Sequence, residues 1–354
     1  MSVHELVRVE PVQLPTLLSQ TGYFDDIQTM KPQEGFVEYS VNSPLWSDGL
    51  AKRRWVRLPP GSHIQTSPHS GPGGGQSWQF PEGTVFLKHF TDPLDGDRKI
   101  ETRVLIHGPA AIAGATYQWN ENGTDAVLQL ERKKLQLSRP AVSAEPVEGS
   151  DDSPSTAGHS NVGILEVDYQ LPSANDCLVC HNPDNKILGI NALQLNGPSP
   201  SNPNVNQLVD WMERGLCDKK FDESALKNSA ALVPIDLEKT GAELIELQAR
   251  SFLHSNCSFC HYPEGTQRTL FDARFETPLK EAHMVKERAV TGYMLVDGKQ
   301  SQFVIAPGKP EDSALFRRLR TLDHELSMPY LGRTSANQPA IDLIKQWILS
   351  MGDP

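Results

Sequence analysis

A pentapeptide with the residues to attach a haem occurs twice in this chain. It is Cys-Leu-Val-Cys-His at residues 177–181 and Cys-Ser-Phe-Cys-His at residues 257–261. Two thiols three residues apart lie on one side of a helical turn, where they can form thioethers with the two vinyl groups of one porphyrin. The histidine that follows can ligate the iron from below the ring. The motifs therefore predict two covalently bound haem c groups, attached and ligated by Cys177, Cys180, His181, Cys257, Cys260 and His261.

Two other interpretations of these cysteines were weighed. Two Cys-x-x-Cys pairs could bind one zinc ion, but zinc ribbons usually place their pairs about 15–20 residues apart. Here residues 181–256, a stretch of 76, separate Cys180 from Cys257. A thiol redox motif would require neither the histidine nor a second copy. The fifth cysteine, Cys217, lies outside both motifs and is expected to be a small buried side chain.

The second motif has the sequence context of a small class I cytochrome c domain. A helix with one apolar face is predicted over residues 243–256 and leads directly into Cys257. After a further helix and a loop that contains Met328, Pro339 opens a closing helix. A thioether opposite the histidine would complete the iron coordination, so Met328 is the predicted partner of His261. Less favourable candidates are Met284, Met294 and His324.

The first motif has no comparable methionine behind it. When residues 191–211 are laid on residues 327–347 without gaps, Trp211 meets Trp347, but Ala192 falls where Met328 stands. The sixth position of the first haem is therefore predicted to be open or filled from elsewhere in the chain. His89, on a predicted strand, is the first candidate metal ligand there. The other available imidazoles are His63, His69, His107 and His159.

The chain ahead of the first motif predicts antiparallel strands. From residue 35 to about 127, short apolar and aromatic stretches are separated by Pro and Gly turns, a pattern typical of a sandwich-like β domain. The Asn122-Gly123 pair predicts a hairpin turn. The expected strands are residues 36–41, 55–58, 84–90, 100–106, 115–119 and 126–130, with one more at 162–171.

We therefore expect an α+β fold in which an N-terminal antiparallel β domain, sandwich-like, precedes a mainly α-helical cytochrome c-like domain. A polar, acidic, Pro- and Ser-rich segment is predicted to be a disordered loop. Residues 1–34 are expected to be an N-terminal lead with a short helix at 12–19, and residues 35–175 the β domain with the disordered loop 139–162. Residues 176–235 are expected to be a first haem segment packed on the β domain, and residues 236–354 the cytochrome c-like domain with the second haem.

The charge and the cofactor chemistry limit the partners and the compartment. The net charge of −11 argues against nucleic acid and anionic membranes and fits redox partner proteins, such as a dehydrogenase or another cytochrome. No apolar run approaches the roughly 20 residues of a membrane span. Residues 1–20 show no export signal. Because covalent haem c is attached outside the bacterial cytoplasm, we nevertheless expect a periplasmic or extracellular protein.

Several short stretches resemble an uncharacterised family of secreted bacterial dihaem c-type cytochromes, found alone or beside quinoprotein-like sugar dehydrogenase domains. The resemblance covers about residues 35–350 and implies export and two covalent haems, but no substrate. The matching stretches are Ser-Pro-Leu-Trp-Ser-Asp at 43–48, Leu-Pro-Pro-Gly at 58–61, Phe-Pro-Glu-Gly-Thr at 80–84, Glu-Thr-Arg at 101–103, Tyr-Gln-Trp-Asn at 117–120, Gln-Leu-Asn at 194–196, Ala-Arg-Ser-Phe-Leu at 249–253, Asn-Cys at 256–257 and Ala-Pro-Gly at 306–308.

These observations predict an electron-transfer protein whose two haems form a relay between a donor and an acceptor. The alternative is a peroxidase-like haem enzyme, in which the second haem feeds electrons to a first haem with an open coordination position. The sixth ligand of the first haem distinguishes the two hypotheses. No nucleophile–base pair is tied to a motif, so no catalytic residue is predicted.

Overall fold

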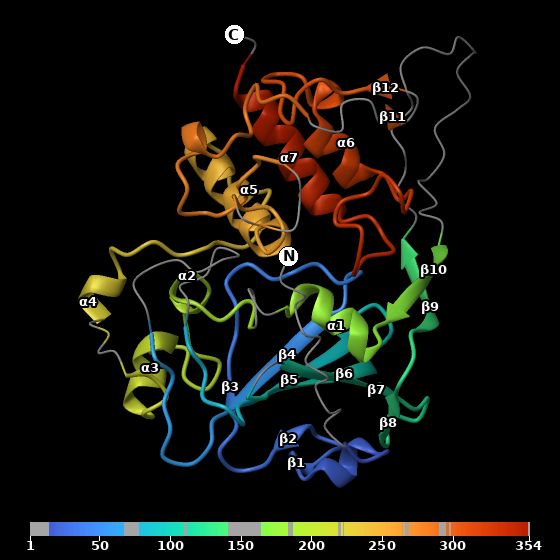
Figure 1. The fold of residues 1–354 in the computed structure, drawn as a ribbon, viewed down its shortest axis with the longest axis vertical. Helices are drawn as coiled ribbons and strands as arrows, with labels where there is room; N and C mark the ends of the chain where they lie inside the picture. Colours follow the sequence, from blue (N-terminus) through green and yellow to red (C-terminus); the bar gives the residue numbers. More distant parts are fainter. Residues whose placement is uncertain are drawn as a thin grey trace, which may run out of the picture.

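A six-stranded antiparallel sheet is the centre of the N-terminal half (Figure 1). The computed structural model describes residues 14–66, 78–109, 112–140, 164–182, 187–218, 221, 223–263, 265, 269–289, 295–296 and 299–352. Consecutive strands pair with each other, as the alternating sequence predicts for a meander. The strands, in order, are β3 (Val37–Glu38), β4 (Ala51–Arg57), β5 (Val85–Asp92), β6 (Arg98–His107), β7 (Ile112–Trp119) and β8 (Ala126–Gln129).

The outer face of the sheet is covered by the start of the chain. Side chains alternate between the two faces of a strand, and Trp55, Leu87 and Tyr117 are buried on this face together with Leu18. The covering segment contains η1 (Leu18–Thr21), β1 (Phe24–Asp26) and β2 (Lys31–Pro32). Residues 14–34 are therefore an integral layer of the β domain and not a separate lead. The short helix predicted at 12–19 is a 3-10 turn that starts at Leu18, and residues 12–13 lie outside the described residues.

The inner face has an apolar cluster at each end. At one end Phe86 packs with Trp211 and other side chains near α2 (Ala192–Leu195) and α3 (Gln207–Glu213). At the other end Phe90 packs with Leu137. The hairpin that supplies Leu137 is formed by β9 (Lys133–Pro140) and β10 (Ile164–Leu171). The helix α1 (Ala174–Cys180) lies over β7 between these clusters (Figure 1).

Two expectations about the β domain need correction. The described residues form one meander with a separate β9–β10 hairpin, not two large sheets packed as a sandwich. The predicted disordered loop begins too early, because Arg139 lies on β9 and forms a buried ion pair with Asp92 (3.0 Å). Residues 141–163 lie outside the described residues. The hairpin turn at Asn122-Gly123 is confirmed, since it joins β7 to β8.

The C-terminal half is mainly helical and packs above the inner face (Figure 1). The helices predicted over 243–256, over 313–320 and from 339 are confirmed, and Phe252, Phe316 and Trp347 are buried together between them. The α+β fold class is confirmed at this level. No helix in the described part of the chain is long and apolar enough to cross a membrane. The C-terminal elements are α4 (Glu223–Leu226), α5 (Ala242–Cys257), η3 (Leu279–Glu281), β11 (Leu295–Val296), β12 (Lys299–Gln300), η4 (Pro310–Asp312), α6 (Ala314–Arg320) and α7 (Gln338–Ser350).

Candidate functional site

The two Cys-x-x-Cys-His segments have the same local geometry. The first motif forms the end of α1, and the backbone N–H of His181 donates to the carbonyl oxygen of Cys177 at 2.9 Å. The second motif starts at the last residue of α5, and the backbone N–H of His261 donates to the carbonyl oxygen of Cys257, also at 2.9 Å. The helical turn that the spacing predicts is therefore present in both motifs.

The two motifs face each other across the boundary between the sheet and the helical half. The pKa of Cys180 is raised to about 11, mainly by burial and secondarily by the neighbouring Cys260 thiol. The pKa of Tyr330 is raised by burial, with further contributions from Cys260 and Cys180. Residues from three distant parts of the sequence are thus brought together. The loop that contains Met328 returns to the place where the two motifs meet.

The thiols have neither the chemistry of a redox pair nor the arrangement of a metal cluster. None of the five cysteines forms a disulfide bond. Burial raises the pKa of Cys257 to about 12, so this thiol is protonated near neutral pH and is a poor nucleophile. No group of three or more His, Cys, Asp or Glu side chains able to hold one metal ion occurs within the described ranges. The zinc and redox interpretations therefore gain no support from the geometry.

Cys217 behaves as expected of a small buried side chain. It is 8% exposed and packs with the apolar cluster around Trp211. Burial raises its pKa to about 12. Met212 lies in the same cluster, where its sulfur accepts the backbone N–H of Phe221 (3.2 Å). The interpretation of Cys217 as a packing residue is confirmed.

The imidazole of His261 is suited to metal ligation. Its ring lies against Phe271 with ring centroids 4.8 Å apart. Burial, and secondarily the charge of Arg318, lower the pKa of His261 to about 4, so the ring is neutral near pH 7. Its Nδ1 is buried and has no hydrogen-bond partner within the described residues. A neutral imidazole beside two thiols is the donor set that a covalently attached haem requires, so the residues present fit this group.

The backbone of Met328 is bonded to Arg318, a residue whose charge acts on His261. Its N–H donates to the carbonyl oxygen of Arg318 at 2.9 Å, and Arg318 is the cation that acts on His261. Its rivals are placed less favourably. Met284 is fully buried in the core between α5 and α7, and the side chain of His324 is 90% exposed. Met294 lies outside the described residues.

His89 lies on the wrong face of the sheet for the first motif, and this prediction is corrected here. Its Nδ1 is 2.9 Å from the hydroxyl of Thr102, and its ring packs against Trp119 on the outer face. Cys177 contacts the inner face, because a Cβ added to Gly114 would meet the Cys177 Cβ at 2.8 Å. A whole sheet thus separates His89 from α1. Of the other histidines, His107 lies two residues after Leu105 on β6 and points to the same, inner face. His63 lies in the loop after β4. His69 and His159 lie outside the described residues.

A set of four cations on the inner face was missed in the sequence. Lys52 and Arg54 lie on β4 and point to the inner face, between neighbours that point to the outer face. Across the sheet, Arg54 lies directly opposite Lys88 on β5, and Lys88 lies directly opposite Arg103 on β6. We call these four residues the cationic belt. The charges of Arg103 and Lys88 act on both Cys177 and Cys180. Strand alternation would have placed the four on one face, but which face α1 covers is a tertiary property.

The segment 43–48, which precedes β4, bonds to α2 and to the residue before the second motif. The backbone N–H of Trp46 donates to the side-chain oxygen of Asn256 (2.8 Å), next to Cys257. The side chain of Gln194 bonds both the N–H and the carbonyl oxygen of Ser43 (2.9 and 2.8 Å). Part of the stretch behind the family resemblance is therefore an inter-domain connection.

Asp48 completes this connection. Its carboxylate accepts the backbone N–H groups of Thr334 (2.8 Å) and Ser335 (2.7 Å), and also both of their hydroxyls. Its own carbonyl oxygen accepts the Arg139 Nε (2.8 Å). Asp48 is 1% exposed. It therefore ties the sheet and the β9–β10 hairpin to the loop that follows Met328.

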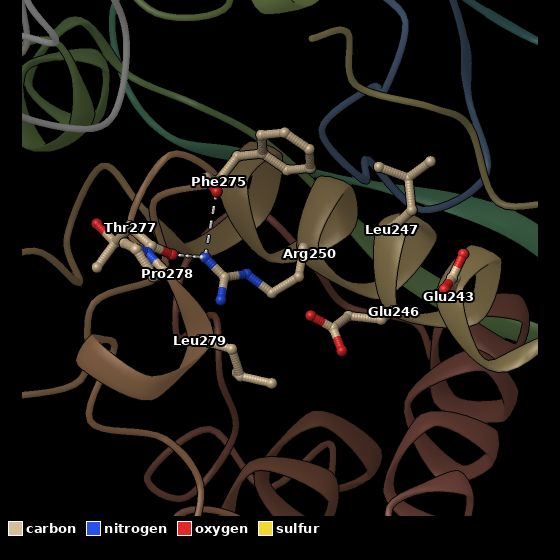
Figure 2. A pocket seen from close by; sticks show the side chains of 8 residues that line it. All are labelled: Glu243, Glu246, Leu247, Arg250, Phe275, Thr277, Pro278 and Leu279. Atoms are coloured by element: carbon tan, nitrogen blue, oxygen red, sulfur yellow. Dashed lines mark hydrogen bonds between the residues drawn. The ribbon is translucent and has the colours of Figure 1, made fainter.

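A groove along the N-terminal half of α5 is remote from the sulfur atoms and has a structural purpose (Figure 2). Arg250 lies in it and donates to the carbonyl oxygens of Arg274 (2.6 Å), Phe275 (3.3 Å) and Thr277 (2.5 Å). The N–H of Phe275 donates to the Nδ1 of His254 (3.1 Å). These bonds hold the loop after the second motif against α5.

Comparison with known proteins gives no family. No family model, curated protein or solved structure matches the chain. The assignment of a function therefore depends on the motifs and on the geometry described above.

Proposed function

We propose that this protein is an exported dihaem c-type cytochrome that carries electrons between redox partner proteins. The single observation that carries this proposal is the meeting of the two motifs. Cys180 and Cys260, which lie far apart in the sequence, are close enough for their charges to interact. Two groups attached there would be neighbours, which is the arrangement that an electron relay needs.

The residues that would hold the groups are those predicted from the sequence. Cys177, Cys180 and His181 would hold the first, and Cys257, Cys260 and His261 the second, with Met328 opposite His261. When bound, the haems supply reversible one-electron chemistry. The chain contributes burial and axial ligands, and a thioether in place of a second imidazole would raise the reduction potential of the second site.

The proposed location and partners follow from chemistry and charge. Covalent attachment of haem c places the protein in the periplasm or outside the cell. The net charge of −11 would favour association with basic or neutral redox proteins. A dehydrogenase or another cytochrome is the proposed class of partner.

A peroxidase-like enzyme is the second candidate, and one observation favours it. His89, the first candidate for the sixth ligand, lies on the opposite face of the sheet from α1. A first site without a strong sixth ligand would bind peroxide or a small gas.

Spectroscopy of the protein produced in a host that attaches haem c tests the proposal. Mass spectrometry should find one covalent haem on each motif peptide. Electron paramagnetic resonance of the oxidised protein should give two low-spin signals for a relay. One low-spin and one high-spin signal would support the enzyme instead, and peroxide turnover would then be measured. A protein without covalent haem would refute both.

The substitution Met328→Leu tests the second site. Because the thioether would be lost, we expect the far-red sulfur-to-iron band to disappear and the low-spin signal of one haem to change, while two haems stay attached. Met284→Leu is the matched control, because that side chain is buried in the core. An unchanged spectrum in Met328→Leu would exclude Met328 as the ligand.

A further inference from the structure

The cationic belt is an unfavourable arrangement by itself. Arg54, Lys88 and Arg103 form a row of directly opposed partners across three strands. Like charges directly opposite each other destabilise a sheet. The arrangement also lies in a chain whose overall charge is −11. A local excess of positive charge in an acidic protein indicates a specific anionic ligand.

Arg54 is buried, and the other three belt residues are partly buried. Arg54 is 8% exposed, and its guanidinium makes one long contact, to the carbonyl oxygen of Lys52 at 3.5 Å. The ammonium group of Lys88 forms no hydrogen bond or ion pair within the described residues. The pKa of Lys88 is lowered to about 7, mainly by burial and secondarily by repulsion from Arg54 and Arg103. Buried cations normally have an anionic partner, because the loss of hydration must be compensated.

The nearby carboxylates do not supply that partner for Arg54 and Lys88. Glu101 accepts Arg103 Nη2 (2.6 Å) and the Tyr169 hydroxyl through Oε1, while its Oε2 has no hydrogen-bond partner within the described residues. The oxygens of Asp48 are occupied by the loop that follows Met328. Lys52 donates to the carbonyl oxygen of Leu45, so Arg54 and Lys88 are the belt residues that no carboxylate of the described residues bonds. A ligand with two carboxylates would supply one to each.

The position of the belt identifies such a ligand. Cys177 contacts Gly114 on β7, whereas Arg54 lies on β4 and Lys88 on β5. Neighbouring strands are about 4.8 Å apart, so Arg54 lies roughly 14 Å across the sheet from the strand that Cys177 touches. A porphyrin carries its two propionates on the edge opposite its vinyl groups. With the vinyl edge at the cysteines, the propionate edge would point toward β5 and β4.

We propose that Arg54 and Lys88 bind the propionate carboxylates of the haem attached at Cys177 and Cys180. This inference rests on the proposed function. The two cations neutralise the propionates and favour the reduced, less positive state of the first haem. Arg103 lies beside them and is held in place by Glu101. No equivalent row of cations is formed by the described residues around the second motif.

The test compares Lys88→Gln and Arg54→Gln with Arg53→Gln in the haem-loaded protein. Arg53 is the matched control because it precedes Arg54 on the same strand, points to the outer face and pairs with Glu38 (2.9 Å). At a fixed potential, we expect each of the first two variants to lower the ratio of reduced to oxidised first haem about tenfold, which corresponds to 59 mV for a one-electron couple. The propionate bands in the resonance Raman spectrum should shift as well.

Three further results decide the outcome. Lys88→Arg keeps the charge and should restore the ratio to within about twofold, which a purely structural role would not predict. The inference would be overturned if Lys88→Gln and Arg54→Gln gave the same ratio of reduced to oxidised first haem as Arg53→Gln while haem was present on the first motif peptide. Succinate that shifts the wild-type ratio would also overturn it, because the belt would then take free dicarboxylates. Absence of haem from the first motif would instead refute the proposed function.

Discussion

The two Cys-x-x-Cys-His segments share one local structure and have different surroundings. Both histidines donate the same backbone hydrogen bond of 2.9 Å to the first cysteine of the motif. The first motif lies on a short helix over a sheet face that carries Lys88 and Arg103. The second lies at the end of the 16-residue α5, against an apolar core that includes Phe252 and Phe271.

This difference indicates how one cofactor type could acquire two potentials. The second site would be adjusted by burial and by the thioether of Met328. The first would be adjusted by the row of Arg54, Lys88 and Arg103, whereas the single charges of Arg318 and Arg333 act on the second motif. The connection at residues 43–48 bonds to Gln194 on α2 and to Asn256 beside the second motif, so it ties the second motif to the N-terminal half.

Removing that connection should have the largest effect. Asp48→Ala leaves the N–H groups of Thr334 and Ser335 without their acceptor in a buried site. We expect a loss of about 3 kcal/mol in the free energy of unfolding, and a single denaturant transition should divide into two. Urea unfolding monitored by circular dichroism measures both.

Asp95→Ala is the control for this prediction. Asp95 is exposed, and within the described ranges its carboxylate pairs with Arg98 alone. Its loss should change the free energy of unfolding by less than about 0.5 kcal/mol. If Asp48→Ala unfolds like Asp95→Ala, the connection does not hold the two halves together.

A change beneath the first motif should disturb that motif alone. In Gly114→Ala the new methyl would lie 2.8 Å from the Cβ and 3.0 Å from the Sγ of Cys177, so α1 must move. We expect a cost of about 1–3 kcal/mol in the free energy of unfolding. In the haem-loaded protein, only the signal of the first haem should change.

The haem-free protein provides the check on Gly114→Ala. Adding Cys177→Gly removes the opposing Cβ and should restore part of the lost stability, which a double-mutant cycle would show as a favourable coupling. Equal changes in the signals of both haems would contradict the claim that the contact is local to the first motif.

The smallest expected effect concerns the cap of α1. Asp176 forms a capping box with Ser173, and the hydrogen bond from Arg132 is the main cause that lowers the pKa of Asp176 to about 2. The carboxylate therefore stabilises the fold above the unfolded pKa of about 3.9, and this contribution is lost as the pH falls toward 2. Because Arg132 is half exposed, we expect less than about 1 kcal/mol.

Asp176→Asn should remove this part of the acid dependence. The free energies of unfolding of the wild type and the variant should differ at pH 6 and converge near pH 2. Asp95→Asn is the control, since Asp95 pairs with Arg98 at an exposed turn, away from the cap. A difference that persists at pH 2 would show that the cap acts without its charge.

The sequence by itself determined the features that depend on local chemistry. The spacing of the cysteines predicted the helical turns of both motifs, and short apolar stretches separated by Pro and Gly turns predicted antiparallel strands. Apolar periodicity predicted α5 and α7, because one face of each helix must be buried. These outcomes follow from contacts between residues near each other in the chain.

Only the tertiary structure decided which groups meet. His89 and Lys88 are adjacent on one strand, and the face that α1 covers places Lys88, not His89, beside the first motif. Asp48 precedes a strand in the sequence, yet its carboxylate binds a loop nearly three hundred positions away. No local pattern encodes such contacts, because they depend on how whole layers pack. The sequence therefore predicts the individual strands and helices, whereas the site depends on how these elements pack against one another.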